Sequence, residues 1–78
     1  MEPGKIYFLA FGGTEIVGRF KDQDGTHYNF YAYLHYWAGF ESFRTICYCV
    51  THGITEMRRA TQAEKHALLK FEIEHETI

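Results

Sequence analysis

The stretch HYNFYAYLHYWAGFESF, residues 27–43, holds eight of the fourteen aromatic residues of the 78-residue chain. Aromatic residues are enriched in β-strands, and the pair Ala38-Gly39 is a turn signal that divides the stretch. The pattern favours a strand over residues 26–37, followed by a turn. A helix is the alternative, because Phe30, Leu34 and Trp37 also recur at helical spacing.

As a strand, residues 26–37 would divide their side chains between two faces, because successive side chains of a strand point in opposite directions. The even positions form the expected core face: Tyr28, Phe30, Ala32, Leu34 and Tyr36. The odd positions form the expected recognition face: His27, Asn29, Tyr31, Tyr33, His35 and Trp37. Tyr and Trp combine a large contact area with a hydrogen-bonding group, which is typical of surfaces that meet a partner.

Glycine-containing turn signals cut the rest of the chain into similar short pieces. They lie at Gly12-Gly13, at Asp22 to Gly25, and at His52-Gly53. The pieces between all the turns, residues 5–11, 14–21, 26–37, 42–50 and 54–59, read as strands, of which 14–21 alternates clearly between apolar and polar residues. The sequence therefore predicts a mainly β (α+β) fold with a small five-stranded antiparallel sheet, strongly curled or closed into a barrel.

The last segment changes to helical periodicity. Thr61 and Glu64 stand in the capping-box relation that begins a helix, and an apolar stripe follows at Ala63, Ala67, Leu68 and Phe71. The acidic residues Glu72, Glu74 and Glu76 would oppose the negative end of the helix dipole. We expect a single domain, with residues 1–60 as the sheet body, residues 61–78 as helix and tail, and fraying or an extended arm beyond Phe71.

Size and composition predict that the chain associates with itself. A chain of 78 residues hides only roughly two thirds of its unfolded surface, yet 46% of its residues are hydrophobic and 18% are aromatic. Some of these side chains should therefore face a ligand or a second subunit, so we expect a homo-oligomer. The formal net charge of -2 provides no overall field that would attract nucleic acid.

The two cysteines point to a reduced, metal-free protein. Cys47 and Cys49 are spaced awkwardly for a disulfide with each other. Together with His52 they spell C-x-C-x-x-H, to which His27 or His35 could add a fourth zinc ligand, but buried thiols without metal are the commoner case. We predict two structural cysteines and no metal. The sequence shows neither a signal peptide nor a run of about 18 apolar residues, and this favours a cytoplasmic protein without a membrane segment.

No catalytic pattern is present. The phosphate-loop, dinucleotide and nucleophile-elbow motifs are all missing, and no motif joins a nucleophile to a base and an orienting group. His66 and His75 lie in the terminal segment, where we expect them to be solvated. The prediction is a protein that is not an enzyme and has no cofactor.

Basic residues beside aromatic ones are the remaining candidates for function. Small barrels bind nucleotides or single strands by stacking bases on rings and holding phosphates with Arg. The predicted ligand-binding residues are Tyr31, Tyr33, His35, Trp37, Arg19, Arg44 and Arg58. The ordinary alternative is that the basic residues only face solvent or flank the helix.

The layout also resembles a group of small proteins encoded by tailed phages and mobile elements. The resemblance lies in EIVGRF (15–20), YLHYWAGFESF (33–43), YCV (48–50) and ITEMRRATQAEKHALL (54–69). It implies an SH3-like sheet whose last strand runs into an A-T-x-x-E helix, and an anti-defence factor that works by binding. It carries over no functional residue.

These observations together predict a non-enzymatic binding protein that sequesters a small anionic, nucleotide-type ligand in an oligomeric pocket of aromatic residues and arginines. The main alternative is an adaptor or inhibitor that binds a host protein through the same aromatic face. A structural phage component and a single-stranded nucleic-acid binder are further alternatives.

Overall fold

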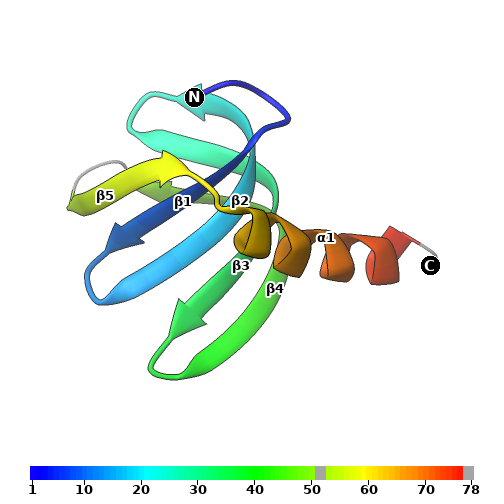
Figure 1. Ribbon diagram of the computed structural model, residues 1–78. Helices are drawn as coiled ribbons and strands as arrows, with labels where there is room; N and C mark the ends of the chain where they lie inside the picture. Colours follow the sequence, from blue (N-terminus) through cyan, green and yellow to red (C-terminus); the bar gives the residue numbers. More distant parts are fainter. Residues whose placement is uncertain (51–52, 77–78) are drawn as a thin grey trace.

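The computed structural model describes residues 1–50 and 53–76, with the backbone alone for residues 46–50 and 76. Its elements, in chain order, are β1 (Ile6–Phe11), β2 (Thr14–Asp24), β3 (His27–Trp37), β4 (Phe40–Val50), β5 (Ile54–Arg59) and α1 (Gln62–Glu76) (Figure 1). All five predicted strands are present, with ends that differ from the prediction by at most three residues. The aromatic stretch begins as a strand, and the helical alternative for it is wrong.

The strands form one antiparallel sheet in the order β4-β3-β2-β1-β5. The first four strands follow one another as a meander, and the chain then returns so that β5 pairs with β1. Figure 1 shows the sheet strongly bent, with α1 packed across one face and the β3–β4 hairpin extending away from β5. The sheet is open, with β4 and β5 as its two edges.

Two tight turns lie at the same end of the sheet. Gly12 and Gly13 have φ values of 53° and 76°, and Ala38 and Gly39 have φ values of 49° and 82°. Two-residue loops with positive φ at both positions are type I′ turns, which match the twist of the strands they join. Ala38 is the one residue other than glycine with positive φ among those described, a conformation that a side chain makes uncommon.

The predicted turn at Asp22 to Gly25 is shorter than expected, because β2 continues to Asp24. Asp22 pairs with Asn29 across the ladder, and the Asn29 Nδ2 donates a hydrogen bond of 2.6 Å to the Asp22 Oδ1. This cross-strand bond holds polar residues in the strand that their turn propensity would place in the loop.

The core consists of two clusters on opposite faces of the sheet. The helix-side cluster contains Ile6, Phe8, Val17, Ala32, Leu34, Ala60 and Leu68. The opposite cluster contains Tyr7, Leu9, Ile16, Phe20 and Phe30. Alternate residues of β1 enter alternate clusters, so β1 is covered on both sides, as expected of a strand inside a bent sheet.

The predicted core face of β3 is divided between these two clusters. Phe30 lies in the opposite cluster, whereas Ala32 and Leu34 lie in the helix-side cluster, so the prediction that these even positions share one face is wrong. The cause is a β-bulge: the ladder pairs Arg19 with Ala32 but Phe20 with Phe30. An extra residue reverses the alternation from that point. The prediction that Phe30 and Leu34 are core residues is confirmed.

The capping box predicted for the helix is confirmed. The Thr61 N–H donates to the Glu64 Oε1 at 2.7 Å, and the Glu64 N–H donates to the Thr61 Oγ1 at 3.3 Å. Leu68 is buried and Ala67 packs against the same cluster. Ala63 is exposed, so the prediction that it belongs to the apolar stripe is wrong.

The prediction that the helix frays or becomes an extended arm beyond Phe71 is wrong, because α1 continues to Glu76. Contacts with the sheet hold this extension. The guanidinium of Arg19 donates two hydrogen bonds to the Glu72 carboxylate, at 3.0 and 2.9 Å. The Phe43 ring stacks on Phe71 at 5.6 Å and also contacts the ring of His75 at 4.6 Å. His75 is exposed, as predicted, but it is not merely solvated.

Two further predictions concern metals and membranes. The side chains of Cys47 and Cys49 and the whole of His52 lie outside the described residues, so the choice between structural thiols and a zinc site stays a prediction. No helix in the described part of the chain combines the length and the apolar character that crossing a membrane requires.

Candidate functional site

The best candidate surface lies at the closed end of the β3–β4 hairpin. The ladder pairs Tyr33 with Arg44, His35 with Ser42, and Trp37 with Phe40. Directly opposite residues of an antiparallel ladder project from the same face. We call the set Tyr33, His35, Trp37, Phe40 and Arg44 the aromatic face. It lies on the side of the sheet away from the helix, since Tyr33 packs against the opposite cluster.

Exposure increases along the aromatic face toward the turn. Tyr33 and His35 are half-buried, with their rings 6.3 Å apart. Trp37 is 58% exposed and Phe40 is 68% exposed, and their ring centroids lie 6.1 Å apart. Trp37 pairs with Thr14, the first residue of β2, so the β2–β3 ladder ends at this pair and the turn extends beyond it. A type I′ turn that contains the uncommon Ala38 conformation holds the two rings in place.

Arg44 is the one predicted arginine that lies on the aromatic face. Its side chain is exposed beside Tyr33 in the ladder. Within the described residues it forms no ion pair. It is therefore available to contact a ligand or a partner.

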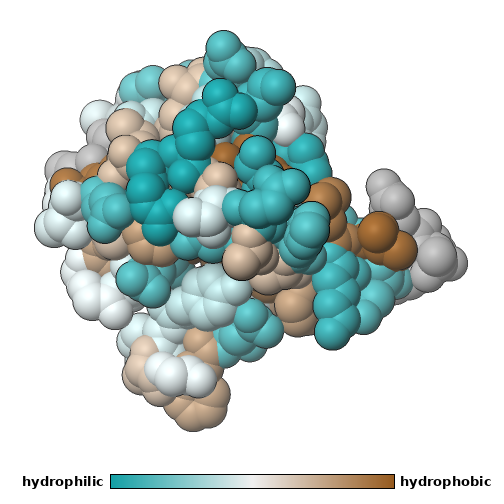
Figure 2. Space-filling view, in the orientation of Figure 1, coloured by the Kyte–Doolittle hydropathy of each residue, from teal (hydrophilic) through white to brown (hydrophobic). Residues whose placement is uncertain are grey.

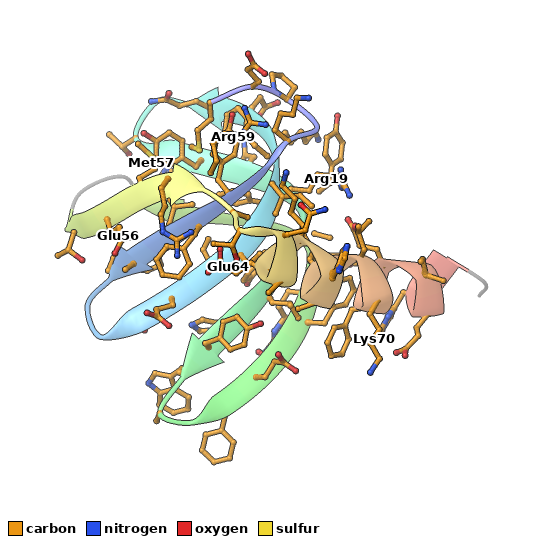
Figure 3. All side chains as sticks on the ribbon, in the orientation of Figure 1. Arg19, Glu56, Met57, Arg59, Glu64 and Lys70 are labelled. Atoms are coloured by element: carbon orange, nitrogen blue, oxygen red, sulfur yellow. The ribbon has the colours of Figure 1, made fainter. Side chains whose placement is uncertain are left out.

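Arg19 lies on the helix side of the sheet, where it anchors α1. Besides its two bonds to Glu72, its Nη1 donates a hydrogen bond of 2.7 Å to the Gly4 carbonyl oxygen. Arg19 is labelled in Figure 3, near α1. The Arg19 and Glu72 side chains are 28% and 16% exposed. Arg19 therefore joins the N-terminal segment, β2 and the helix.

Arg58 also lies on the helix side, in contact with Glu64 and Glu56. It donates two hydrogen bonds to the Glu64 carboxylate, at 2.9 and 3.0 Å, and one to Glu56 at 2.9 Å. Its guanidinium stacks over the Phe8 ring at 4.1 Å. Hydrogen bonding to Arg58 lowers the pKa of the Glu64 carboxyl, and the same contacts raise the pKa of Arg58. Arg58 thus fastens the start of the helix to β5.

Tyr31 lies apart from the aromatic face, at the bulge in β3. Its ring is 49% exposed, and the Lys21 Nζ lies 5.9 Å from the ring centroid. The seven predicted ligand-binding residues are therefore not brought together within one chain. Tyr33, His35, Trp37 and Arg44 share a face, whereas Arg19, Arg58 and Tyr31 lie elsewhere.

Sequence reasoning missed Phe40, although the signal was present. Ala38-Gly39 is a turn signal, and a two-residue loop places Phe40 directly opposite Trp37. It also missed the row formed by Glu15, Tyr36 and Glu41, which are neighbours across three strands. That row becomes visible only when the register of β2, β3 and β4 is known.

A groove lies between the two tight turns, and its lining includes residues of both faces of the sheet: Trp37 and Phe40 of the aromatic face, and Glu15, Tyr36 and Glu41 of the helix side. Its volume is about 690 Å³, and its lining also includes Phe11. The pKa of Tyr36 is raised to about 12, first by burial and then by the neighbouring Glu41, with smaller effects of Glu64 and Glu15. The groove is therefore negatively charged and partly walled by aromatic rings. Figure 2 shows pale and brown, less polar atoms at the end of the molecule that the β3–β4 hairpin forms.

Comparison with protein-family models, with curated proteins and with solved structures found no match to this chain.

Proposed function

We propose that this protein is a non-enzymatic binding protein that recognises another protein through the aromatic face. The observation that carries the proposal is the exposure of Trp37 and Phe40, whose rings are neighbours on a tight hairpin. Apart from Tyr31, the other aromatic rings of the sheet that the structure describes are buried or half-buried. Aromatic residues, Trp above all, are enriched among the few side chains that contribute most of the binding energy of a protein interface. Large exposed apolar patches on soluble proteins mark such sites.

A protein partner suits this surface better than the nucleotide-type ligand that the sequence predicts. A phosphate would need cations beside the rings, and Arg44 is the one predicted arginine on this face. Arg19 and Arg58 are engaged with glutamates on the helix side. The adjoining groove carries Glu15 and Glu41, whose charges repel a phosphate.

The SH3-like character implied by the sequence belongs to the same proposal. A four-stranded meander whose fifth strand returns to pair with the first supports it. In this proposal the sheet is a rigid scaffold that presents the hairpin turn to the partner.

The experiment is an affinity selection of a random displayed peptide library on the immobilised protein. The test variant is the double substitution Trp37→Ser and Phe40→Ser, and the matched control is Tyr31→Ser with Met57→Ser, which also removes two exposed large apolar side chains. We expect the wild type and the control to enrich the same peptides and the test variant to lose them. Equal enrichment by the test variant, or no enrichment by the wild type, would contradict the proposal.

A thermal-shift screen with nucleotides complements the selection. A ligand that binds the folded chain raises its unfolding temperature with concentration. We expect no shift from nucleotides, and a shift that Arg44→Ala abolishes would favour the nucleotide-type ligand instead.

A further inference from the structure

A row of side chains crosses four strands on the helix side of the sheet, next to the hairpin turn. The ladder pairs Ala10 with Glu15, Glu15 with Tyr36, and Tyr36 with Glu41. Paired residues share a face, so the Tyr36 ring lies between two carboxylates. Neighbouring strands are about 4.8 Å apart, and the strands that carry Glu15 and Glu41 are therefore roughly 10 Å apart.

These two carboxylates differ from the other described glutamates that face the sheet. Glu72 pairs with Arg19, and Glu56 and Glu64 pair with Arg58. Among the residues the structure describes, neither Glu15 nor Glu41 has a Lys or Arg partner. Both side chains are exposed, and Glu41 accepts a hydrogen bond from the Tyr36 hydroxyl. A cation placed between the two carboxylates would be attracted to both.

The carboxylates do not stand alone, because they form part of the groove whose wall continues to the exposed rings of Trp37 and Phe40. The groove is open, and its aromatic members are Phe11, Tyr36, Trp37 and Phe40. The guanidinium of Arg or the ammonium of Lys is attracted both to carboxylates and to aromatic faces. The flat guanidinium of Arg, carried on an apolar stem, matches a groove that contains both carboxylates and aromatic rings.

Alternative occupants fit less well. A single metal ion needs several oxygen ligands within about 2.6 Å, and no group of three or more metal-ligating side chains occurs in the described part of the chain. An anion would be repelled by the carboxylates of Glu15 and Glu41.

We propose that the groove between the two tight turns binds an arginine or lysine side chain of the partner protein, held between Glu15 and Glu41 over Tyr36. This inference rests on the proposed function and names the chemistry of the partner: a basic residue beside an apolar one. The apolar residue would contact Trp37 and Phe40, while the basic residue occupies the groove.

The test uses two capped peptides, Gly-Arg-Gly-Arg-Gly and the same sequence with citrulline in place of arginine. Citrulline keeps the shape of arginine and removes the charge. Binding is followed by NMR of the isotopically labelled protein. We expect the arginine peptide to shift the amide signals of residues 14–16 and 36–41, and to bind roughly tenfold more tightly than the citrulline peptide, since a charge-assisted hydrogen bond contributes about 1.5 kcal/mol or more. Added salt should reduce the difference.

The matched variants separate the groove from general electrostatics. Glu15→Gln with Glu41→Gln should abolish the preference for arginine. Glu2→Gln with Asp24→Asn removes two exposed acids elsewhere and should keep it. Equal binding of the two peptides, shifts elsewhere on the protein, or a preference that survives in the Glu15/Glu41 variant would overturn the inference. The library selection tests the proposed function independently of this result. If the selected peptides lack basic residues but still require Trp37 and Phe40, the inference about the groove is wrong and the proposed function is still supported.

Discussion

The middle of β3 and the hairpin turn that follows β3 are both rich in aromatic residues, but their environments are opposite. Phe30 and Leu34 are 1% and 0% exposed, whereas Trp37 and Phe40 at the hairpin turn are mostly exposed. The Phe30 ring contacts Phe20 at 6.1 Å and lies over the backbone of Gly18, and Leu34 is part of the cluster that Leu68 of the helix completes. The turn has no such cover. Coverage by distant segments, and not aromatic content, decides which rings form core and which form surface.

The largest effect should come from the covered middle of β3. Phe30→Ala removes a fully buried ring, and we expect it to lower the free energy of unfolding by roughly 3 to 5 kcal/mol, enough to unfold so small a protein. Urea unfolding measures the loss. Tyr31→Ala, one residue further along the strand, should cost within about 1 kcal/mol because its ring is half-exposed. Similar losses of unfolding free energy for the two variants would contradict the claim that Phe30 is a covered core residue and Tyr31 is not.

A second test addresses how Phe30 is covered. A Cβ atom at Gly18 would lie 2.7 Å from the Phe30 Cδ1 and 3.1 Å from the Tyr33 Cβ. Gly18→Ala should therefore destabilise the fold by roughly 1 to 3 kcal/mol through overpacking. In a Phe30→Leu background the same substitution should cost less, and a double-mutant cycle measures this coupling. Additive costs would show that the ring does not rest on Gly18.

A third test concerns the helix that covers the other side of the sheet. Glu72→Gln removes one charge from the paired, partly buried contact with Arg19, and we expect a loss of about 1 kcal/mol. Faster hydrogen exchange should be confined to the last turns of α1. Lys70→Gln, on the exposed surface of the same helix, should leave exchange unchanged. Equal effects of both variants would mean that the ion pair does not hold the helix.

The sequence allowed the five strands, their turns and the start of the helix to be predicted, because these depend on local signals. The glycine pairs marked the turns, and the Thr61–Glu64 capping box marked the helix start. The bulge at Tyr31 had no local marker. It reverses the side-chain alternation of β3, and so it changed the composition of both faces.

The candidate site was predictable only in part, for a similar reason. Tyr33, His35 and Trp37 were correctly placed on a common face because alternation holds beyond the bulge. Arg19 engages Glu72, which is 53 residues away in the chain. Pairing over such a distance leaves no trace in the local pattern, so an arginine in an ion pair and one available for a ligand look alike in sequence.

A fourth test concerns Tyr36, at the boundary between the covered and the exposed regions. Its pKa is raised from 10.0 to about 12 in the folded chain, first by burial and then by Glu41. The folded state therefore holds this proton more tightly than the unfolded state. Its contribution to stability is complete below about pH 10 and is lost as the pH rises to about 12. Tyr36→Phe should flatten the fall of the unfolding free energy over this pH range. An unchanged slope would place Tyr36 in an ordinary solvated environment.

The most direct test of the central claim uses Trp37, the one tryptophan of the chain, as a fluorescent reporter of the hairpin turn. The free protein should emit like a solvent-exposed indole and should be quenched readily by acrylamide at every protein concentration. Peptides recovered from the library selection should move the emission to shorter wavelength and protect it from the quencher. Buried-type emission from the free monomer, or no response to bound peptide, would contradict the claim that this end of the hairpin is a recognition surface.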